Sequence, residues 1–222
     1  MTPNNIAGMA TLAGLNIVAL TDHNSTKNCP AFFAAAKKNG IIPIAGMELT
    51  TAEDIHVVCL FPELEKAMAF DEFVQGHRIL IKNRTDIFGN QFILDKDDNI
   101  IGSDEFLLSN ATDITIDDVP GFAEQFDGIC YPAHVDREAN GAIATLGDFP
   151  DCDGFRCCGF HDADKIESYL EKYPSIKSRK PLVSSDAHYL WDIRDKQNYI
   201  MLEDEPYSSD FVRKKLFEYL RG

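Results

Sequence analysis

Short apolar segments of strand length alternate along the chain with longer segments in which apolar residues recur at helical spacing. This pattern predicts strands at 15–20, 41–45, 55–61, 128–131, 154–160, 181–184 and 198–202. It predicts helices at 2–13, 29–38, 62–87, 116–125, 162–173 and 208–222. Because the strands are apolar on both faces and alternate with helices, we expect a parallel sheet covered by helices, closed into a distorted β/α barrel.

One segment interrupts this alternation. Residues 92–101 predict a small β-hairpin around Lys96-Asp97-Asp98-Asn99, which we interpret as an insertion on the loop side of the sheet. The sequence contains no repeat, low-complexity tract or linker. A chain of 222 residues is within the range of one α/β barrel, so residues 1–222 are predicted to form a single domain.

Metal-binding side chains stand at the ends of four of these apolar segments. The four ends are Thr21-Asp22-His23, Gly46-Met47-Glu48, Pro132-Ala133-His134 and Ser185-Asp186-Ala187-His188. In barrel enzymes the chemistry lies at the C-terminal ends of the strands, so we expect these side chains to meet at one rim. Histidine, aspartate and glutamate brought together from separate strands are typical of a site that holds several divalent cations for hydrolysis.

Charge and cysteine content narrow the function further. The net charge of −15 argues against broad nucleic-acid binding, because no basic excess exists to neutralise phosphates. A phosphorylated substrate would need local positive charge, which bound metal ions supply. The six cysteines contain no C-x-x-C pair, so we expect free thiols in a reducing cytoplasm. No apolar stretch reaches membrane-spanning length, and no membrane partner is predicted.

The ordered motifs resemble those of the PHP family, named for polymerase and histidinol phosphatase. The matching segments are 20–24 (Leu-Thr-Asp-His-Asn), 46–48 (Gly-Met-Glu), 56–58 (His-Val-Val), 132–137 (Pro-Ala-His-Val-Asp-Arg) and 184–188 (Ser-Ser-Asp-Ala-His). The resemblance implies a distorted barrel with two or three metal ions, usually zinc, manganese or iron, and phosphoester hydrolysis. It also implies contact between Arg137 and a substrate phosphate. The implied metal ligands are His23, Glu48, His56, His134, Asp186 and His188.

The sequence departs from the family pattern at its start. The family normally carries Asp-x-His-x-His on a first strand, and this chain has no such motif; it opens on a helix cap at Thr2-Pro3. We therefore expect the first strand and two or three ligands to be missing, with Met1 an internal methionine of a longer protein. If the chain truly starts at Met1, the alternative is a catalytically impaired, metal-poor module for binding or scaffolding.

Several of these residues also have plain structural interpretations. Asp22 either orients His23 or a metal-bound water, and Glu48 alternatively caps a following helix. Arg137 alternatively pairs with Asp136 or another carboxylate. His56 stands at the start of its predicted strand, where the strand-end rule does not explain it, and by itself would be a core histidine. His77 and His161 are both predicted to be ordinary exposed histidines.

The function predicted from these residues is metal-dependent hydrolysis of phosphoesters, with a small phosphorylated metabolite or a nucleotide as the substrate. A bridging carboxylate such as Glu48 can hold two cations about 3.5 to 4 Å apart with a hydroxide between them. Arg137 and the metals would neutralise charge on the phosphoryl oxygens, and Asp22 would assist. A barrel amidohydrolase acting on C–N bonds uses similar ligands and is a further alternative.

Overall fold

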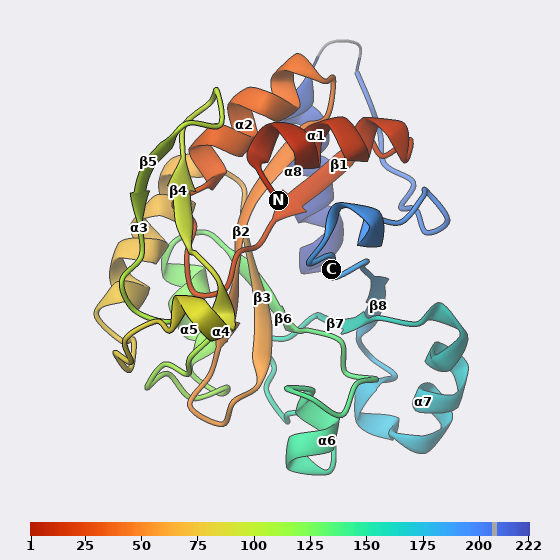
Figure 1. Cartoon of the computed structure of the whole chain (residues 1–222). Coiled ribbons are helices and arrows are strands. Elements are labelled where there is room, and N and C mark those ends of the chain that lie inside the picture. The colour runs from red at the N-terminus through yellow and green to blue at the C-terminus, as the bar shows by residue number, and fades with distance from the viewer. Residues whose placement is uncertain (206–207) are drawn as a thin grey trace.

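A four-stranded sheet in the order β1-β2-β3-β6 lies at the centre of the computed structural model, which describes residues 1–205 and 208–222 (Figure 1). Its strands are β1 (Ile17–Leu20), β2 (Ile42–Thr50), β3 (His56–Phe61) and β6 (Ile129–Pro132). β1 and β2 are parallel, but β3 runs antiparallel to both β2 and β6. The expected wholly parallel sheet is therefore wrong at β3. Residues 51–55 are too few for a parallel crossover, which needs a dozen or more.

Two smaller sheets complete the strands. β7 (Cys157–Phe160) pairs in parallel with β8 (Lys180–Val183). β4 (Phe92–Leu94) and β5 (Ile100–Ser103) form an antiparallel pair, which confirms the predicted hairpin. The mixed α/β class is confirmed, while the closed barrel and the single domain stay predictions.

Helices surround the central sheet (Figure 1). They are α1 (Pro3–Leu12), α2 (Cys29–Lys38), α3 (Leu64–Gln75), α4 (Thr85–Phe88), α5 (Val119–Gln125), α6 (Ala142–Leu146), α7 (Ile166–Lys172) and α8 (Ser209–Arg221). Three 3-10 turns accompany them at η1 (Ala163–Lys165), η2 (Pro174–Ile176) and η3 (Leu190–Asp192). The predicted cap at Thr2 is present, because its side chain accepts a hydrogen bond from the Asn5 amide. Ser208 caps α8 in the same way by accepting from the Phe211 amide. No helix in the described part of the chain has the length and apolar character needed to cross a bilayer.

Two sequence predictions fail in the connecting segments. The helix expected at 62–87 ends at Gln75, and the chain then forms bridges at Arg78 and Lys82 with the segment that follows the hairpin. The strand expected at 198–202 is irregular, and Tyr199 and Met201 there are exposed. In the first segment Ile79, Leu80 and Ile81 are exposed, so helical spacing of apolar residues was a misleading signal. In the second segment Ile200 and Leu202 pack against the core without pairing as a strand.

The central sheet is buried on both faces. One face carries Met47, Leu49 and Val57 in the main core. The opposite face carries Ile44 and Leu60, and a second cluster there includes Tyr131 and the α8 residues Leu216 and Phe217. Because side chains alternate along a strand, Glu48 of β2 and His56 of β3 project from the same face as this second cluster. The alternation therefore points both predicted ligands to one side of the sheet.

The segment 76–112 contains the predicted hairpin and is called the insertion from here on; it is attached to the sheet by polar side chains. The Asn24 side chain donates to the carbonyl oxygens of Leu108 and Asn110, each at 2.7 Å, and its Oδ1 accepts from the Thr50 amide at 2.9 Å. The Asp104 carboxylate pairs with Lys27 Nζ, outside the insertion, at 2.9 Å. It also pairs with Arg78 Nη1, inside the insertion, at 3.1 Å. These contacts hold the insertion beside the ends of β1 and β2.

Gly46 allows β1, β2 and β3 to pack closely near the site. A Cβ there would lie 2.7 Å from the Cys59 carbonyl oxygen and 2.9 Å from Thr21 Cγ2. We expect Gly46→Ala to destabilise the protein by about 1–3 kcal/mol in urea unfolding, because the contacted backbone has little room to move. Gly8→Ala in α1 is the control. Its new Cβ meets nothing within 4 Å, so a gain of about 0.5–1 kcal/mol is expected. Equal effects of the two substitutions would contradict this interpretation.

Candidate metal centre

Three predicted ligands from neighbouring strands meet at one edge of the sheet. His23 follows β1, Glu48 lies near the end of β2, and His56 begins β3; one ligand atom from each lies within 4.8 Å of the others. Glu48 Oε2 is 3.7 Å from His23 Nδ1, and Glu48 Oε1 is 3.4 Å from His56 Nδ1. Because β3 is antiparallel to β2, its first residue lies at the same edge as the end of β2. The strand direction therefore explains the position of His56.

His134 joins these three residues from the end of β6, and we call the four together the imidazole cluster. Its Nε2 lies 3.5 Å from Glu48 Oε1 and 3.2 Å from His56 Nδ1. The backbone of His134 has a φ of 27°, in the left-handed region that residues other than glycine rarely adopt. Such a conformation costs on the order of 1–3 kcal/mol and is typical of functional sites.

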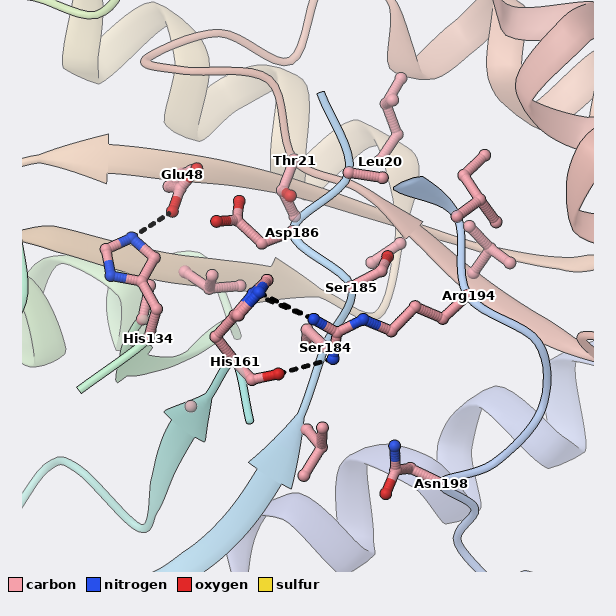
Figure 2. Close-up of a pocket in the computed structure, with 18 of the residues that line it drawn as sticks. Leu20, Thr21, Glu48, His134, His161, Ser184, Ser185, Asp186, Arg194 and Asn198 are labelled. Carbon is pink, nitrogen blue, oxygen red and sulfur yellow. Dashed lines mark hydrogen bonds and ion pairs between the residues drawn. The ribbon is translucent and has the colours of Figure 1, made fainter. Parts of the chain in front are cut away.

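Asp186 and His188 follow β8 on the other side of the cluster. The Asp186 side chain points toward Glu48 (Figure 2). Asp186 Oδ1 is 3.8 Å from His188 Nδ1, and the His188 ring centroid is 5.7 Å from that of His23. The structure thus brings all six predicted ligands to one region, in a tight group of four and an adjoining pair.

The donor set of the imidazole cluster fits a divalent cation. Nδ1 of His23, which faces Glu48, is buried and has no hydrogen-bond partner among the described residues. The contacts of 3.4 to 3.7 Å to Glu48 are longer than ordinary hydrogen bonds. Two ligand atoms about 2.0–2.1 Å from a tetrahedral zinc would be about 3.3–3.5 Å apart, which is close to these spacings. Imidazole with carboxylate suits zinc, manganese or iron.

Local electrostatics favour the protonation states that bind metals. Burial by itself would raise the pKa of Glu48, but contacts with His134 and His56 and the charge of His23 outweigh it and hold that pKa below its usual value. Burial lowers the pKa of His23, although the Glu48 charge opposes the shift. At neutral pH the carboxylate is therefore ionised and the His23 ring is neutral, as metal ligation requires.

Asp22 and Arg137 lie beside the ligands. Asp22 accepts a hydrogen bond from Asn28 Nδ2 at 3.1 Å and lines the pocket described below. Burial raises the pKa of the Asp22 carboxyl group, and the hydrogen bond from Asn28 opposes that rise. Arg137 Nη1 lies 2.6 Å from Asp186 Oδ2. Arg137 therefore pairs with a carboxylate, as the structural alternative expected, and that carboxylate belongs to Asp186. Asp136 accepts instead from the backbone amides of residues 161 and 162.

A pocket of about 360 Å³ adjoins the cluster (Figure 2). Glu48, His134 and Asp186 line one part of it, and His161 and Arg194 line another. The expectation that His161 is an ordinary exposed histidine is wrong, because it is partly buried in the pocket wall. His161 directly follows β7, so the strand-end rule would have found it. Arg194 lies in an irregular segment after η3, where no local pattern marks it.

This site lies on a mixed α/β fold and has the side chains of a metal centre. A model of the PHP domain family matches residues 1–119, somewhat more than half of the chain, and the chain belongs to that family. No curated protein matches the sequence.

Three solved structures are similar in fold. The lesion-specific endonuclease EndoQ from Pyrococcus furiosus has a TM-score of 0.65 and 20% identity, over 100% of this chain and 51% of that one. A complex of Endonuclease Q with a 27-mer duplex substrate carrying an abasic lesion at the active site has a TM-score of 0.57 and 19% identity, over 100% of this chain and 53% of that one. A candidate metal-dependent phosphoesterase from Bifidobacterium adolescentis has a TM-score of 0.55 and 16% identity, over 97% of this chain and 90% of that one. The chain thus spans about half the length of the endonuclease chains, and these likenesses show the fold.

Proposed function

We propose that this protein is a metal-dependent hydrolase of phosphoesters. The observation that carries the proposal is the imidazole cluster: His23, Glu48 and His56 each place a ligand atom within 4.8 Å of the others, and His134 Nε2 lies 3.5 Å from Glu48 Oε1. His23 Nδ1, which faces Glu48, is buried without a hydrogen-bond partner among the described residues, and this is costly in the absence of a ligand. Membership of the PHP domain family and the fold likeness to a candidate metal-dependent phosphoesterase support the same function.

The six predicted ligands divide into two groups within this proposal. The imidazole cluster holds one cation, and Asp186 with His188 contributes to a neighbouring one; zinc, manganese or iron suit these ligands. Bound metal supplies Lewis-acid polarisation of the phosphoryl group and an activated water. Arg137 donates hydrogen bonds to phosphoryl oxygens, and Asp22 accepts a proton or a hydrogen bond from water in the pocket.

A small phosphorylated metabolite or a nucleotide is the proposed substrate. The pocket of about 360 Å³ is within the range of small-molecule sites, which are about 300–1,000 Å³. The net charge of −15 opposes long contacts with nucleic acid. DNA is the competing substrate class, because the Endonuclease Q neighbour was solved with a DNA duplex. Duplex DNA therefore has to be tested as a substrate beside the small esters.

The test combines metal analysis with hydrolysis of a chromogenic phosphate monoester, small diesters and duplex DNA with an abasic site. We expect bound metal and metal-stimulated turnover of small esters, with Asp186→Ala and His134→Ala lowering turnover by at least about a hundredfold. His77→Ala is the matched control, because His77 lies outside the cluster and pairs with Asp113. Absence of metal-stimulated turnover across the panel, or an equal loss in His77→Ala, would contradict the proposal. Turnover of the DNA alone would replace the proposed substrate class.

A further inference from the structure

Two arginines converge on one imidazole in the wall of the pocket. Arg137 Nη2 lies 2.9 Å from Nδ1 and 3.1 Å from Nε2 of His161. Arg194 Nη2 lies 3.3 Å from the same Nδ1 and 2.8 Å from the same Nε2. Figure 2 shows the Arg194 side chain extended across this side of the pocket to reach His161. The two guanidinium groups come from segments far apart in the sequence, one after β6 and one after η3.

This arrangement has more hydrogen-bond donors than acceptors. A neutral imidazole offers one acceptor lone pair, and each guanidinium carries five N–H donors. Both arginines therefore compete for a single lone pair on His161. Arg194 Nη1 also donates to the His161 carbonyl oxygen at 2.5 Å, and Arg137 Nη1 donates to Asp186. The nearby Asp136 carboxylate accepts hydrogen bonds from the backbone amides of residues 161 and 162 and pairs with Lys165 Nζ at 3.9 Å, so its direct partners are other groups than the two arginines.

Positive charge is concentrated here in a strongly acidic protein. Asp186 is the carboxylate in ion-pair contact with Arg137, and it is also one of the proposed metal ligands. A cation bound by Asp186 would compensate that carboxylate and leave the charges of both arginines available. Planar guanidinium groups match the oxygens of phosphate and donate to them in pairs.

We propose that Arg194 is a substrate-binding residue and, with Arg137, forms an anion subsite around His161 that takes a phosphate group. Both guanidinium groups contact the same ring, so one phosphate can accept hydrogen bonds from both of them. Arg194 then determines affinity for the phosphorylated substrate, and His161 positions the two arginines. The assignment rests on the proposed function for its substrate, but phosphate binding tests it without turnover.

Inorganic phosphate binding to the metal-loaded full chain, measured by calorimetry, is the experiment. We expect Arg194→Gln to weaken phosphate binding by about 10- to 100-fold, as for the loss of a charge-assisted hydrogen-bonding group. Arg194→Lys keeps the positive charge but loses the planar guanidinium group, so it should weaken phosphate binding less than Arg194→Gln does. Arg221→Gln is the control, because Arg221 lies at the end of α8 and donates to the Asp127 carbonyl oxygen outside this pocket. With a turned-over ester, Arg194→Gln should raise KM more than it lowers kcat.

A second readout separates binding from a structural role of Arg194. The bond to the His161 carbonyl means that Arg194→Gln can lower the melting temperature without any ligand. The phosphate-induced rise in melting temperature should be lost in this variant and kept in Arg221→Gln. Phosphate affinity within twofold of wild type, or an equal loss in Arg221→Gln, overturns the subsite and leaves the proposed hydrolase standing. Phosphate binding that depends on Arg194 in a protein that hydrolyses no ester supports the subsite and removes the hydrolase.

Discussion

Glu48→Gln is expected to abolish metal binding in the imidazole cluster and to lower phosphoesterase activity by about a thousandfold or more. Glu48 is the carboxylate of that cluster, with His23, His56 and His134 placed around it. Glutamine has nearly the same shape, so the substitution removes the negative charge and little else. Metal content per chain and the turnover of a chromogenic phosphate ester are the measurements.

The control for this substitution is Glu63→Gln, at the exposed start of α3. It should keep the wild-type metal content and activity. Retention of metal by Glu48→Gln, or an equal loss in the control, would show that the cluster is not a metal site.

In the metal-free protein, the effect of Glu48→Gln on the free energy of unfolding should depend on pH. The pKa of Glu48 is lowered in the folded state, so its carboxylate stabilises the fold fully above the unfolded value of about 4.3 and loses this effect as pH falls through the folded pKa. The stability difference between wild type and Glu48→Gln should therefore be largest near neutral pH and shrink in acid. Urea unfolding of the chelator-treated proteins at several pH values measures this difference. A difference that grows in acid would contradict the lowered pKa.

Asp104→Ala is expected to cause the largest loss of stability, about 3–5 kcal/mol. The Asp104 side chain is 8% exposed and pairs with Arg78, whose side chain is 4% exposed. Lys27 contacts the same carboxylate at 2.9 Å. Removing the carboxylate leaves a buried guanidinium without its charge partner, which is far more costly than the pair was favourable. The free energy of unfolding in urea is the measurement.

The neighbouring residue provides a matched control. Glu105 pairs with Lys82 at 3.5 Å, and both side chains are exposed. Glu105→Ala should therefore change stability by only about 0–1 kcal/mol. Replacing both buried partners, as Arg78→Met with Asp104→Leu, should recover much of the loss. Similar losses from Asp104→Ala and Glu105→Ala would mean that the buried ion pair does not stabilise the protein.

The strand ends were the most predictable part of the site. His23, Glu48, His134, Asp186 and His188 each follow or end an apolar strand-length run, and the structure brings them to one region. The N-cap of the first helix at Thr2 was also predictable, because a cap depends on residues within one turn of it. Their metal-binding roles stay predictions.

Strand direction and long-range pairing were not predictable in the same way. His56 joins the cluster only because β3 is antiparallel to β2, and the apolar pattern of a buried strand is the same in either direction. The helical spacing beyond Gln75 was misleading, because Arg78 there forms a buried ion pair with a residue 26 positions away.

Apolar periodicity and strand-end chemistry therefore specify the class of fold and most of the candidate metal ligands, because both depend on residues that are neighbours in the chain. Tertiary packing decides the rest. The contact of Arg137 with Asp186, and the convergence of Arg137 and Arg194 on His161, join segments that no local spacing relates. Such contacts depend on which turns and strands fold against one another, and this is set by burial across the whole chain rather than by any one segment.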